Sequence, residues 1–127
     1  MSDPERPIVV YVPDLLMRQQ IVEGLLAAGI PARGAATESR FQAALAQEDA
    51  SAILLELDGV GIDGVALVAR LAGDPATAAT PVIGFCAHTR VDLIEGSRAA
   101  GAAKVISRGE LHRRLPQIAA QVATSSR

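Results

Sequence analysis

A carboxylate follows an apolar run near the middle of the chain. Glu56 comes directly after the residues Ser51-Ala52-Ile53-Leu54-Leu55, and Asp58 and Asp63 lie in the segment beyond it. Open α/β sheets place their chemistry at the carboxyl ends of buried strands, so Glu56 occupies a candidate functional position. A carboxylate there can accept a transferred group, bind a metal ion or pair with a cation.

Polar side chains also follow three other strand-like runs. They lie in the segments Val12-Pro13-Asp14, Cys86-Ala87-His88 and Ser107-Arg108. Asp14 is either a metal ligand or the N-cap of the helix that follows it. Cys86 is either a reactive thiol or a small buried hydrophobe. Arg108 can bind a carboxylate through its planar guanidinium, and we expect an ion pair between Arg108 and Glu56.

Composition narrows the classes of protein to consider. The chain has 127 residues and a formal net charge of −2, with acids and bases mixed along it, so it lacks the clustered basic face of a nucleic-acid-binding protein. No apolar stretch reaches the roughly 20 residues that a membrane-spanning helix needs. The single cysteine, Cys86, excludes an internal disulfide and a cysteine-cluster metal site. His88 and His112 have no partner at metal-ligand spacing. From its composition as a whole, we expect a cytoplasmic protein.

Strand-like and helical patterns alternate along the chain and would position these side chains. We expect strands at residues 8–12, 30–35, 52–57, 81–87 and 103–106. Helices are expected between Asp14 and Gly29, from a Thr37 cap to Gln47, from Gly64 to Gly73, and over residues 91–100 and 110–122. This alternation predicts an α/β fold with a doubly wound, five-stranded parallel sheet. The strand order is expected to be 2-1-3-4-5, as in flavodoxin-like folds, with helices on both faces.

Apolar spacing predicts which side of each helix is buried. In the first helix, the residues that recur at helical spacing are Leu15, Ile21, Val22, Leu25 and Leu26. Leu93, Ile94 and Ala99 are expected to face inward from the fourth helix, and residues 76–80 to form a surface loop. Pro116 conflicts with a straight last helix because proline in a helix interior costs roughly 3 kcal/mol. Either the helix is kinked there, or residues 110–115 form a separate turn.

Four segments resemble the receiver domain of response regulators, the CheY-like family. They are Glu56 to Asp63-Gly64, Thr80-Pro81-Val82-Ile83, Ala99-Ala100-Gly101-Ala102 and Ser107-Arg108. Their order and spacing match that family over about residues 7–123, which implies that residues 1–127 form a single receiver-like domain. A typical receiver takes a phosphoryl group from a phosphohistidine onto an Asp and uses Mg²⁺ to neutralise the transferring group.

The resemblance places Glu56 where the family has its phosphoacceptor Asp, so this chain is an atypical member of the pattern. Asp58 is the alternative acceptor if the third strand ends later than expected, although Asp58-Gly59 also reads as an ordinary turn. The family's acidic pair is matched by Pro13 and Asp14, which leaves at most one acid. The resemblance therefore implies no firm metal site, with Asp14 and Glu56 as the only candidate ligands of Mg²⁺.

The positions that switch conformation in the family also differ. Cys86 matches the usual Thr or Ser, Val105 matches the switch aromatic, and Arg108 matches the usual Lys. Glu56 carries one charge, whereas a phosphoryl group adds about 1.5 to 2, so it would imitate a phosphorylated Asp only in part. A buried ion pair with Arg108 and no signalling role is the simpler interpretation.

Three functions follow, in order of preference. The first is a stand-alone receiver-like domain of bacterial signal transduction that binds a protein partner, a histidine kinase or another signalling protein, without phosphorylation or enzymatic activity. The second is a phosphoacceptor that uses Glu56 or Asp58 with Mg²⁺. The third is a small flavodoxin-like enzyme or ligand-binding protein. A small basic cluster near the end of the chain is either a partner-contact surface or a solvated helix end; it comprises Arg108, His112, Arg113 and Arg114. The face formed by the fourth helix, fifth strand and fifth helix is a candidate homodimer interface.

Overall fold

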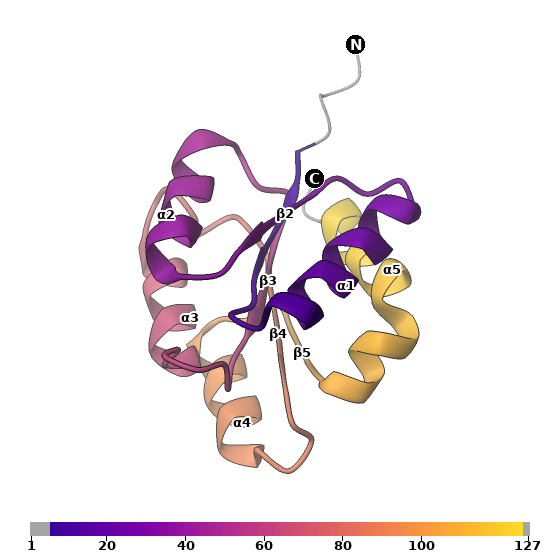
Figure 1. The fold of residues 1–127 in the computed structure, drawn as a ribbon. Helices are drawn as coiled ribbons and strands as arrows, with labels where there is room; N and C mark the ends of the chain where they lie inside the picture. The colour runs from indigo at the N-terminus through magenta and orange to yellow at the C-terminus, as the bar shows by residue number, and fades with distance from the viewer. Residues whose placement is uncertain (1–5, 126–127) are drawn as a thin grey trace.

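Buried apolar strands form the centre of the computed structural model, which describes residues 6–125 and the side chains of residues 6–121 (Figure 1). The strands are β1 (Ile8–Tyr11), β2 (Ala32–Ala35), β3 (Ala52–Glu56), β4 (Val82–Cys86) and β5 (Lys104–Ser107). All neighbouring strands are parallel, in the order β2-β1-β3-β4-β5. Every residue of β1, β3 and β4 is buried, as expected for strands covered on both faces.

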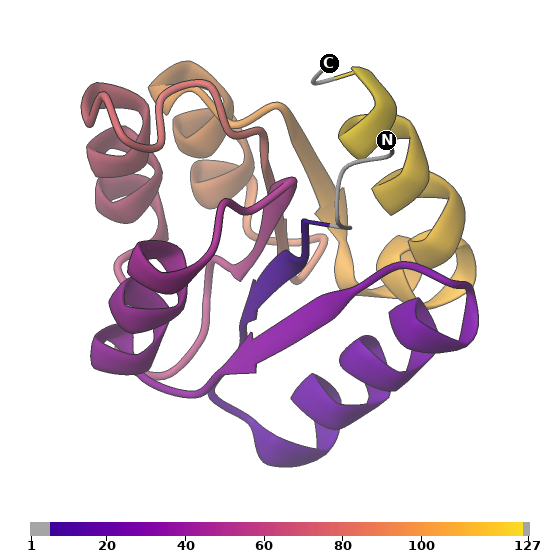
Figure 2. The ribbon, with the colours of Figure 1, turned by 90° about the horizontal axis from the view of Figure 1, so that it is seen from above.

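Helices cover both faces of this sheet (Figure 2). They are α1 (Leu15–Ala27), α2 (Glu38–Gln47), α3 (Gly64–Gly73), α4 (Val91–Ala100) and α5 (Arg108–Ser125). The apolar side chains of α1 and α5 pack against one face, and those of α2, α3 and α4 pack against the other. The predicted doubly wound fold and the strand order 2-1-3-4-5 are confirmed.

Alternate residues of each strand enter different cores. Val10 and Leu54 pack with Ile21 and Leu25 of α1, together with the apolar residues of α5. Val9 and Leu55 pack with Phe41 and with the apolar residues of α3. The rings of Tyr11 and Phe41 stack with their centroids 4.9 Å apart. Two of the three aromatic residues therefore lie in one core, whereas Phe85 lies in the other, which aliphatic side chains otherwise fill.

Side-chain caps begin the helices α1, α2 and α3. Asp14 Oδ2 accepts a hydrogen bond of 2.8 Å from the Met17 amide, and Thr37 Oγ1 accepts one of 3.2 Å from the Arg40 amide. Asp63 Oδ1 accepts one of 3.2 Å from the Ala66 amide. These bonds satisfy amides that the first helical turn leaves without partners. The predicted caps at Asp14 and Thr37 are confirmed.

The strands differ from the predicted ranges by one or two residues at several ends. The predicted strands end at Val12 and Leu57, but β1 ends at Tyr11 and β3 ends at Glu56. The second strand is predicted to begin at Ile30, but β2 begins at Ala32. The Val12 amide still bonds the Ala35 carbonyl at 3.1 Å, and the Leu57 amide bonds the Phe85 carbonyl at 2.9 Å. After these last hydrogen bonds the chain enters the loops. The apolar sequence therefore extends beyond the regular hydrogen bonding of the strands.

Two predictions of facing direction were wrong, and two leucines of α1 that recur at helical spacing are exposed. Leu15 and Leu26 are 59% and 53% exposed, because the buried stripe of α1 is centred on Ile21 and Leu25. In α4, Ala99 is exposed and Ser97 is fully buried instead. The loop of residues 76–80 is not entirely on the surface, since Thr77 is buried and its hydroxyl donates to the Leu71 carbonyl at 2.7 Å.

The last helix is longer than predicted and is kinked. It begins at Arg108, two residues before the predicted start at Glu110, and Ser107 Oγ accepts a hydrogen bond of 3.1 Å from the Glu110 amide. Arg114 has non-helical angles of φ −131° and ψ 19°, just before Pro116. Proline has no amide hydrogen, and its ring collides with the carbonyl four residues earlier. The kink predicted from Pro116 is therefore present, displaced by two residues to Arg114.

Candidate functional site

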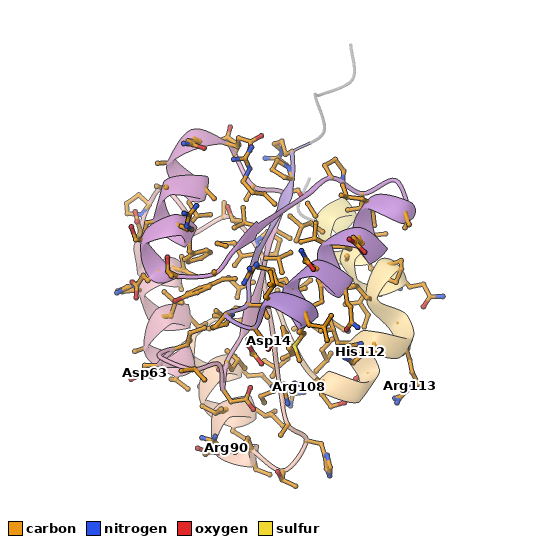
Figure 3. All side chains as sticks on the ribbon, viewed as in Figure 1. Asp14, Asp63, Arg90, Arg108, His112 and Arg113 are labelled. Carbon is orange, nitrogen blue, oxygen red and sulfur yellow. The ribbon has the colours of Figure 1, made fainter. Side chains whose placement is uncertain are left out.

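Glu56 and Arg108 approach each other across the end of the sheet. Glu56 is the last residue of β3, and Arg108 follows β5 directly, with β4 lying between the two strands. The Arg108 guanidinium crosses this gap 5.8 Å above the centre of the Phe85 ring, which belongs to β4. Figure 3 shows Asp14, Asp63, Arg90 and Arg108 at this same end of the molecule. Strand order therefore makes neighbours of two residues that are 52 positions apart.

Arg108 binds two carboxylates with one nitrogen. Its Nη2 atom lies 2.9 Å from Glu56 Oε2 and 2.8 Å from Asp58 Oδ1. The Glu56 and Asp58 side chains are only 9% and 13% exposed, so both carboxylates are largely withdrawn from water. The expected Arg108–Glu56 ion pair is present, and Asp58 extends it into a three-residue cluster that sequence reasoning missed.

Asp58 makes a second contact that fixes the neighbouring loop. Its Oδ2 atom accepts a hydrogen bond of 3.1 Å from the Ala87 amide, directly after β4. The same carboxylate thus joins the ends of β3, β4 and β5. Turn chemistry or a displaced acceptor, the two interpretations of Asp58-Gly59 from the sequence, give no indication of this contact. The signal that could have found this contact is the spacing of two acids, Glu56 and Asp58, around one buried residue, Leu57.

The cluster is held together by opposite charges. The two carboxylates are negative and the guanidinium is positive, so the formal net charge of the cluster is −1. Burial by itself lowers the pKa of Arg108, but the hydrogen bond to Glu56 and the charge of Asp58 outweigh burial and raise the pKa above its ordinary value. The guanidinium is therefore protonated at neutral pH. A charge-assisted arrangement of this kind is short-ranged and directional, so it can set the positions of both carboxylates.

Cys86 lies at the end of β4 with no exposed surface. Burial raises the pKa of its thiol, and the nearby charge of Asp58 raises it further. The thiolate is the nucleophilic form of cysteine, so this environment disfavours reaction at neutral pH. Cys86 packs with Leu57 and Val105 in the core beside α3 and α4, which favours the interpretation of a small buried hydrophobe over a reactive thiol.

The end of β1 brings no carboxylate to the cluster. Asp14 is exposed and caps α1, and the Arg18 side chain donates to the carbonyls of Val12 and Pro13 at 2.8 and 3.1 Å. A Cβ atom placed on Gly59 would lie 3.1 Å from Pro13 Cδ and 3.0 Å from Glu56 Oε1. Pro13, rather than an acid, therefore closes this side of the cluster.

This arrangement does not fit a magnesium ion. Mg²⁺ needs octahedral oxygen ligands, usually including one or two carboxylates free to bind it. Here both available carboxylates already face a guanidinium, and Asp14 serves as a helix cap. Over residues 6–125, no group of three or more His, Cys, Asp or Glu residues is arranged to hold a metal.

The predicted basic cluster on α5 is smaller than expected. His112, Arg113 and Arg114 are exposed, but Arg108 turns inward to Glu56 and Asp58. Arg114 is further paired with Glu110 at 3.5 Å.

Val105 is buried on β5, so an aliphatic side chain fills the place that the resemblance gives to an aromatic.

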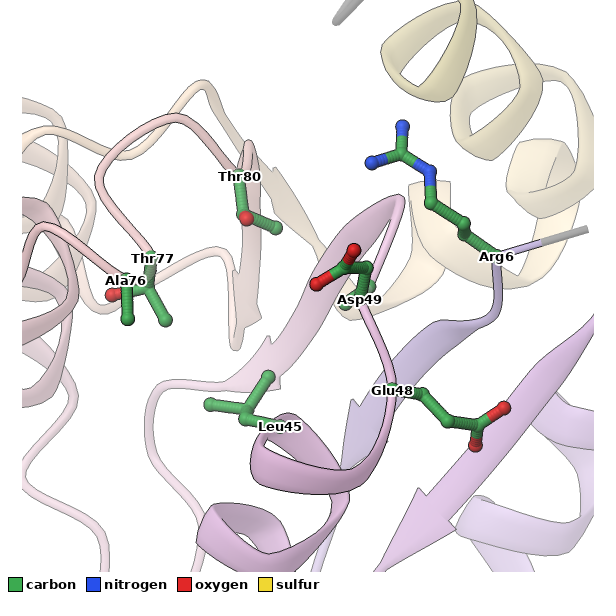
Figure 4. A pocket seen from close by; sticks show the side chains of 8 residues that line it. Arg6, Leu45, Glu48, Asp49, Ala76, Thr77 and Thr80 are labelled. Atoms are coloured by element: carbon green, nitrogen blue, oxygen red, sulfur yellow. The ribbon is translucent and has the colours of Figure 1, made fainter. Parts of the chain in front are cut away.

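Two cavities lie away from the carboxylate cluster. One of about 250 Å³ opens at the other end of the sheet, between the segments that lead into β3 and β4 (Figure 4). Its lining includes Arg6, Asp49, Thr77 and Thr80. Another of about 290 Å³ lies beside it, between α2 and the end of α3, and also includes Thr77. Neither contains a nucleophile paired with a base, so the chemistry of the strand ends remains the better guide to function.

Comparison with known proteins gives structural matches only. No family model matches the chain, and no curated protein matches it. A CheY-like response regulator receiver domain protein from Methanospirillum hungatei JF-1 is similar in structure, with a TM-score of 0.84 and 16% identity over 97% of both chains. A response regulator from Thermotoga maritima has a TM-score of 0.81 and 18% identity over 95% of this chain and 99% of that one.

This chain has the receiver-domain fold. NtrX from Brucella abortus, in a structure with ATP, matches 97% of this chain with a TM-score of 0.85 and 20% identity. The chain spans only 28% of that longer protein, so the likeness concerns one part of it. Within the described part of the receiver-like chain, no helix is long and apolar enough to cross a membrane.

Proposed function

We propose that this receiver-like chain is a protein-interaction domain of bacterial signal transduction that works without phosphorylation and without catalysis. One observation carries the proposal: Arg108 binds both Glu56 and Asp58 at the end of β3, where the resemblance places a phosphoacceptor. The Nη2 atom and the positive charge of Arg108 are already shared by two carboxylates, which disfavours the binding of an incoming phosphoryl group.

Three further features support this proposal. Glu56 is one methylene longer than Asp, so an attack arranged for Asp would be misplaced, and small misplacements cost large factors in rate. Pro13 stands where a second acid would help to hold a metal, and it packs near Gly59 and Glu56. Cys86 offers only a weak hydrogen-bond donor in place of a hydroxyl. The partner we propose is a signalling protein, such as a histidine kinase, in the cytoplasm.

Phosphorylation can be tested directly by intact mass. The wild-type chain and a Glu56→Asp variant are incubated with acetyl phosphate and Mg²⁺, and each mass is compared with an untreated sample. We expect the wild type to gain no phosphoryl group. A wild-type chain that gains one, mapped by fragmentation to Glu56 or Asp58, would overturn the proposal and support the phosphoacceptor alternative.

The variant then separates two causes. A Glu56→Asp chain that gains a phosphoryl group would mean that only the acceptor differs from a working receiver. A variant that stays unmodified would mean that metal binding is also lost, as the positions of Pro13 and Asp14 lead us to expect.

A further inference from the structure

The Asp58 carboxylate accepts more hydrogen bonds than a residue that only forms a turn needs. Each of its carboxylate oxygens has a separate donor: Arg108 Nη2 at 2.8 Å for Oδ1 and the Ala87 amide at 3.1 Å for Oδ2. These donors come from positions 50 and 29 residues away in the sequence. A guanidinium together with a backbone amide is a common protein site for carboxylate and phosphate anions. The ends of parallel strands are also where this kind of sheet binds ligands.

We propose that Asp58 is a built-in anion, which permanently fills an oxyanion-binding site formed by Arg108 and the Ala87 amide. The chemical class that this site accepts is a carboxylate or a phosphate-like oxyanion. Glu56 does not play the same part, because no hydrogen bond joins it to Ala87 among the residues that the structure describes; it holds Arg108 from the other side. The site is thus present in the fold and closed to ligands in solution by one side chain of the same chain.

The bound carboxylate has a consequence for the surface beyond β4. The Ala87 carbonyl accepts a hydrogen bond of 3.0 Å from the Arg90 amide, and Arg90 is the N-cap residue of α4. Asp58 therefore fixes the loop that leads into α4, and α4 begins from one arrangement of this loop. This step rests on the proposed function, since a constant α4 surface is what a phosphorylation-independent partner would bind.

The test removes the built-in anion and supplies a free one. Amide exchange and chemical shifts are measured by NMR for the wild type, Asp58→Ala and a control, Asp49→Ala. Asp49 is exposed at the other end of the sheet, so its replacement changes the net charge equally without touching the site. Each protein is titrated with inorganic phosphate, and with sodium chloride at matched ionic strength, in the absence of Mg²⁺ and of a phosphodonor.

In Asp58→Ala we expect the Ala87 amide to exchange about fivefold faster, as the loss of one hydrogen bond implies. Phosphate, and not chloride, should then shift the Ala87 and Arg108 signals in a saturable way and slow the exchange again. The wild type and Asp49→Ala should show no such response. Asp58→Asn provides a second check, because its amide oxygen can still accept from Ala87 and should keep the site filled.

Two results would overturn the inference. One is an Asp58→Ala protein that remains folded, as its amide spectrum would show, but responds to phosphate no differently from chloride. The other is a wild type that binds phosphate at Ala87 as well as the variant does. If Asp58→Ala does not fold, a saturable phosphate response at Ala87 in the wild type or in Asp58→Asn would still overturn the inference, because the site is expected to be filled in both. Covalent phosphorylation is read separately by mass, so failure of this inference and failure of the proposed function remain distinguishable.

Discussion

At the scale of single residues, Arg108 contributes most to the site because it is the only cation bound to Glu56 and Asp58 in the described part of the chain. Replacing Arg108 with Ala leaves two largely buried carboxylates without their counter-charge. Removing one partner of a buried pair costs several kcal/mol, and partial exposure of Arg108 reduces this, so we expect a loss of about 2 kcal/mol in unfolding free energy. Urea denaturation measures it.

The matched control for this change is Arg113→Ala. Arg113 is exposed on α5 and makes no ion pair among residues 6–121. Its replacement should change the unfolding free energy by less than about 0.5 kcal/mol, as is usual for surface positions. Equal losses in the two variants would contradict the role assigned to Arg108.

The raised pKa of Cys86 predicts how the stability of the folded protein depends on pH. Its pKa is raised in the folded state by burial and by Asp58, so the folded protein holds the thiol proton more tightly than the unfolded chain does. The corresponding stability is fully present below the unfolded value of 9.0 and is lost as pH rises through the folded pKa. Unfolding free energy measured between pH 7 and about pH 10.5 should fall above about pH 9.

A Cys86→Ala variant separates this contribution from that of Tyr11, whose pKa is also raised by burial and by the charge of Glu38. The variant should have lower stability at neutral pH because of the smaller side chain, but a shallower decline above pH 9. A decline of unchanged slope would show that Cys86 does not contribute to it.

At the scale of secondary-structure elements, Asp14 tests whether the start of α1 serves the helix or a metal. Its side chain caps the Met17 amide and is exposed. Asp14→Ala should cost about 1 kcal/mol, whereas Asp14→Ser should restore most of that loss, because serine also caps helices but supplies no carboxylate. Thermal or urea unfolding of both variants, with and without Mg²⁺, gives the answer. Stabilisation of the wild type alone by Mg²⁺ would favour the metal-ligand alternative.

The same scale shows how far the sequence could predict the molecule. The alternation of apolar strands with capped helices was enough to predict a parallel sheet with helices on both faces, because each cap and each buried run acts over a few neighbouring residues. The strand order came from the flavodoxin-like pattern, which five such strands fit. The Glu56–Arg108 pair was also predictable, since parallel strand ends meet at one edge. The contact of Asp58 with Ala87 was not, because it depends on the path of the loop after β3. The exposure of Leu15 and Leu26 depends on how α1 is rotated against the sheet, which apolar spacing specifies only loosely.

At the scale of the whole molecule, the site and the core meet at Leu57, which lies between the two carboxylates and is 1% exposed. A Cβ atom on Gly84 would lie 2.8 Å from a Leu57 methyl group, so β4 needs glycine at this point. Gly84→Ala must push Leu57 aside, and overpacking of this kind usually costs 1 to 3 kcal/mol, so we expect a loss of about 2 kcal/mol. Because Glu56 and Asp58 flank Leu57, the Ala87 and Arg108 NMR signals should move as well.

Gly73→Ala is the matched control for this coupling, since a Cβ atom there meets nothing within 4 Å and the residue ends α3 on the surface. It should leave the Ala87 and Arg108 signals in place and keep or slightly raise stability, because alanine restricts the unfolded chain more than glycine does. If Gly84→Ala lowers stability but leaves those signals unmoved, the cluster is positioned independently of Leu57. If both change together, packing beneath the sheet end sets the distance between the carboxylates and Arg108, and the buried core determines the geometry of the site.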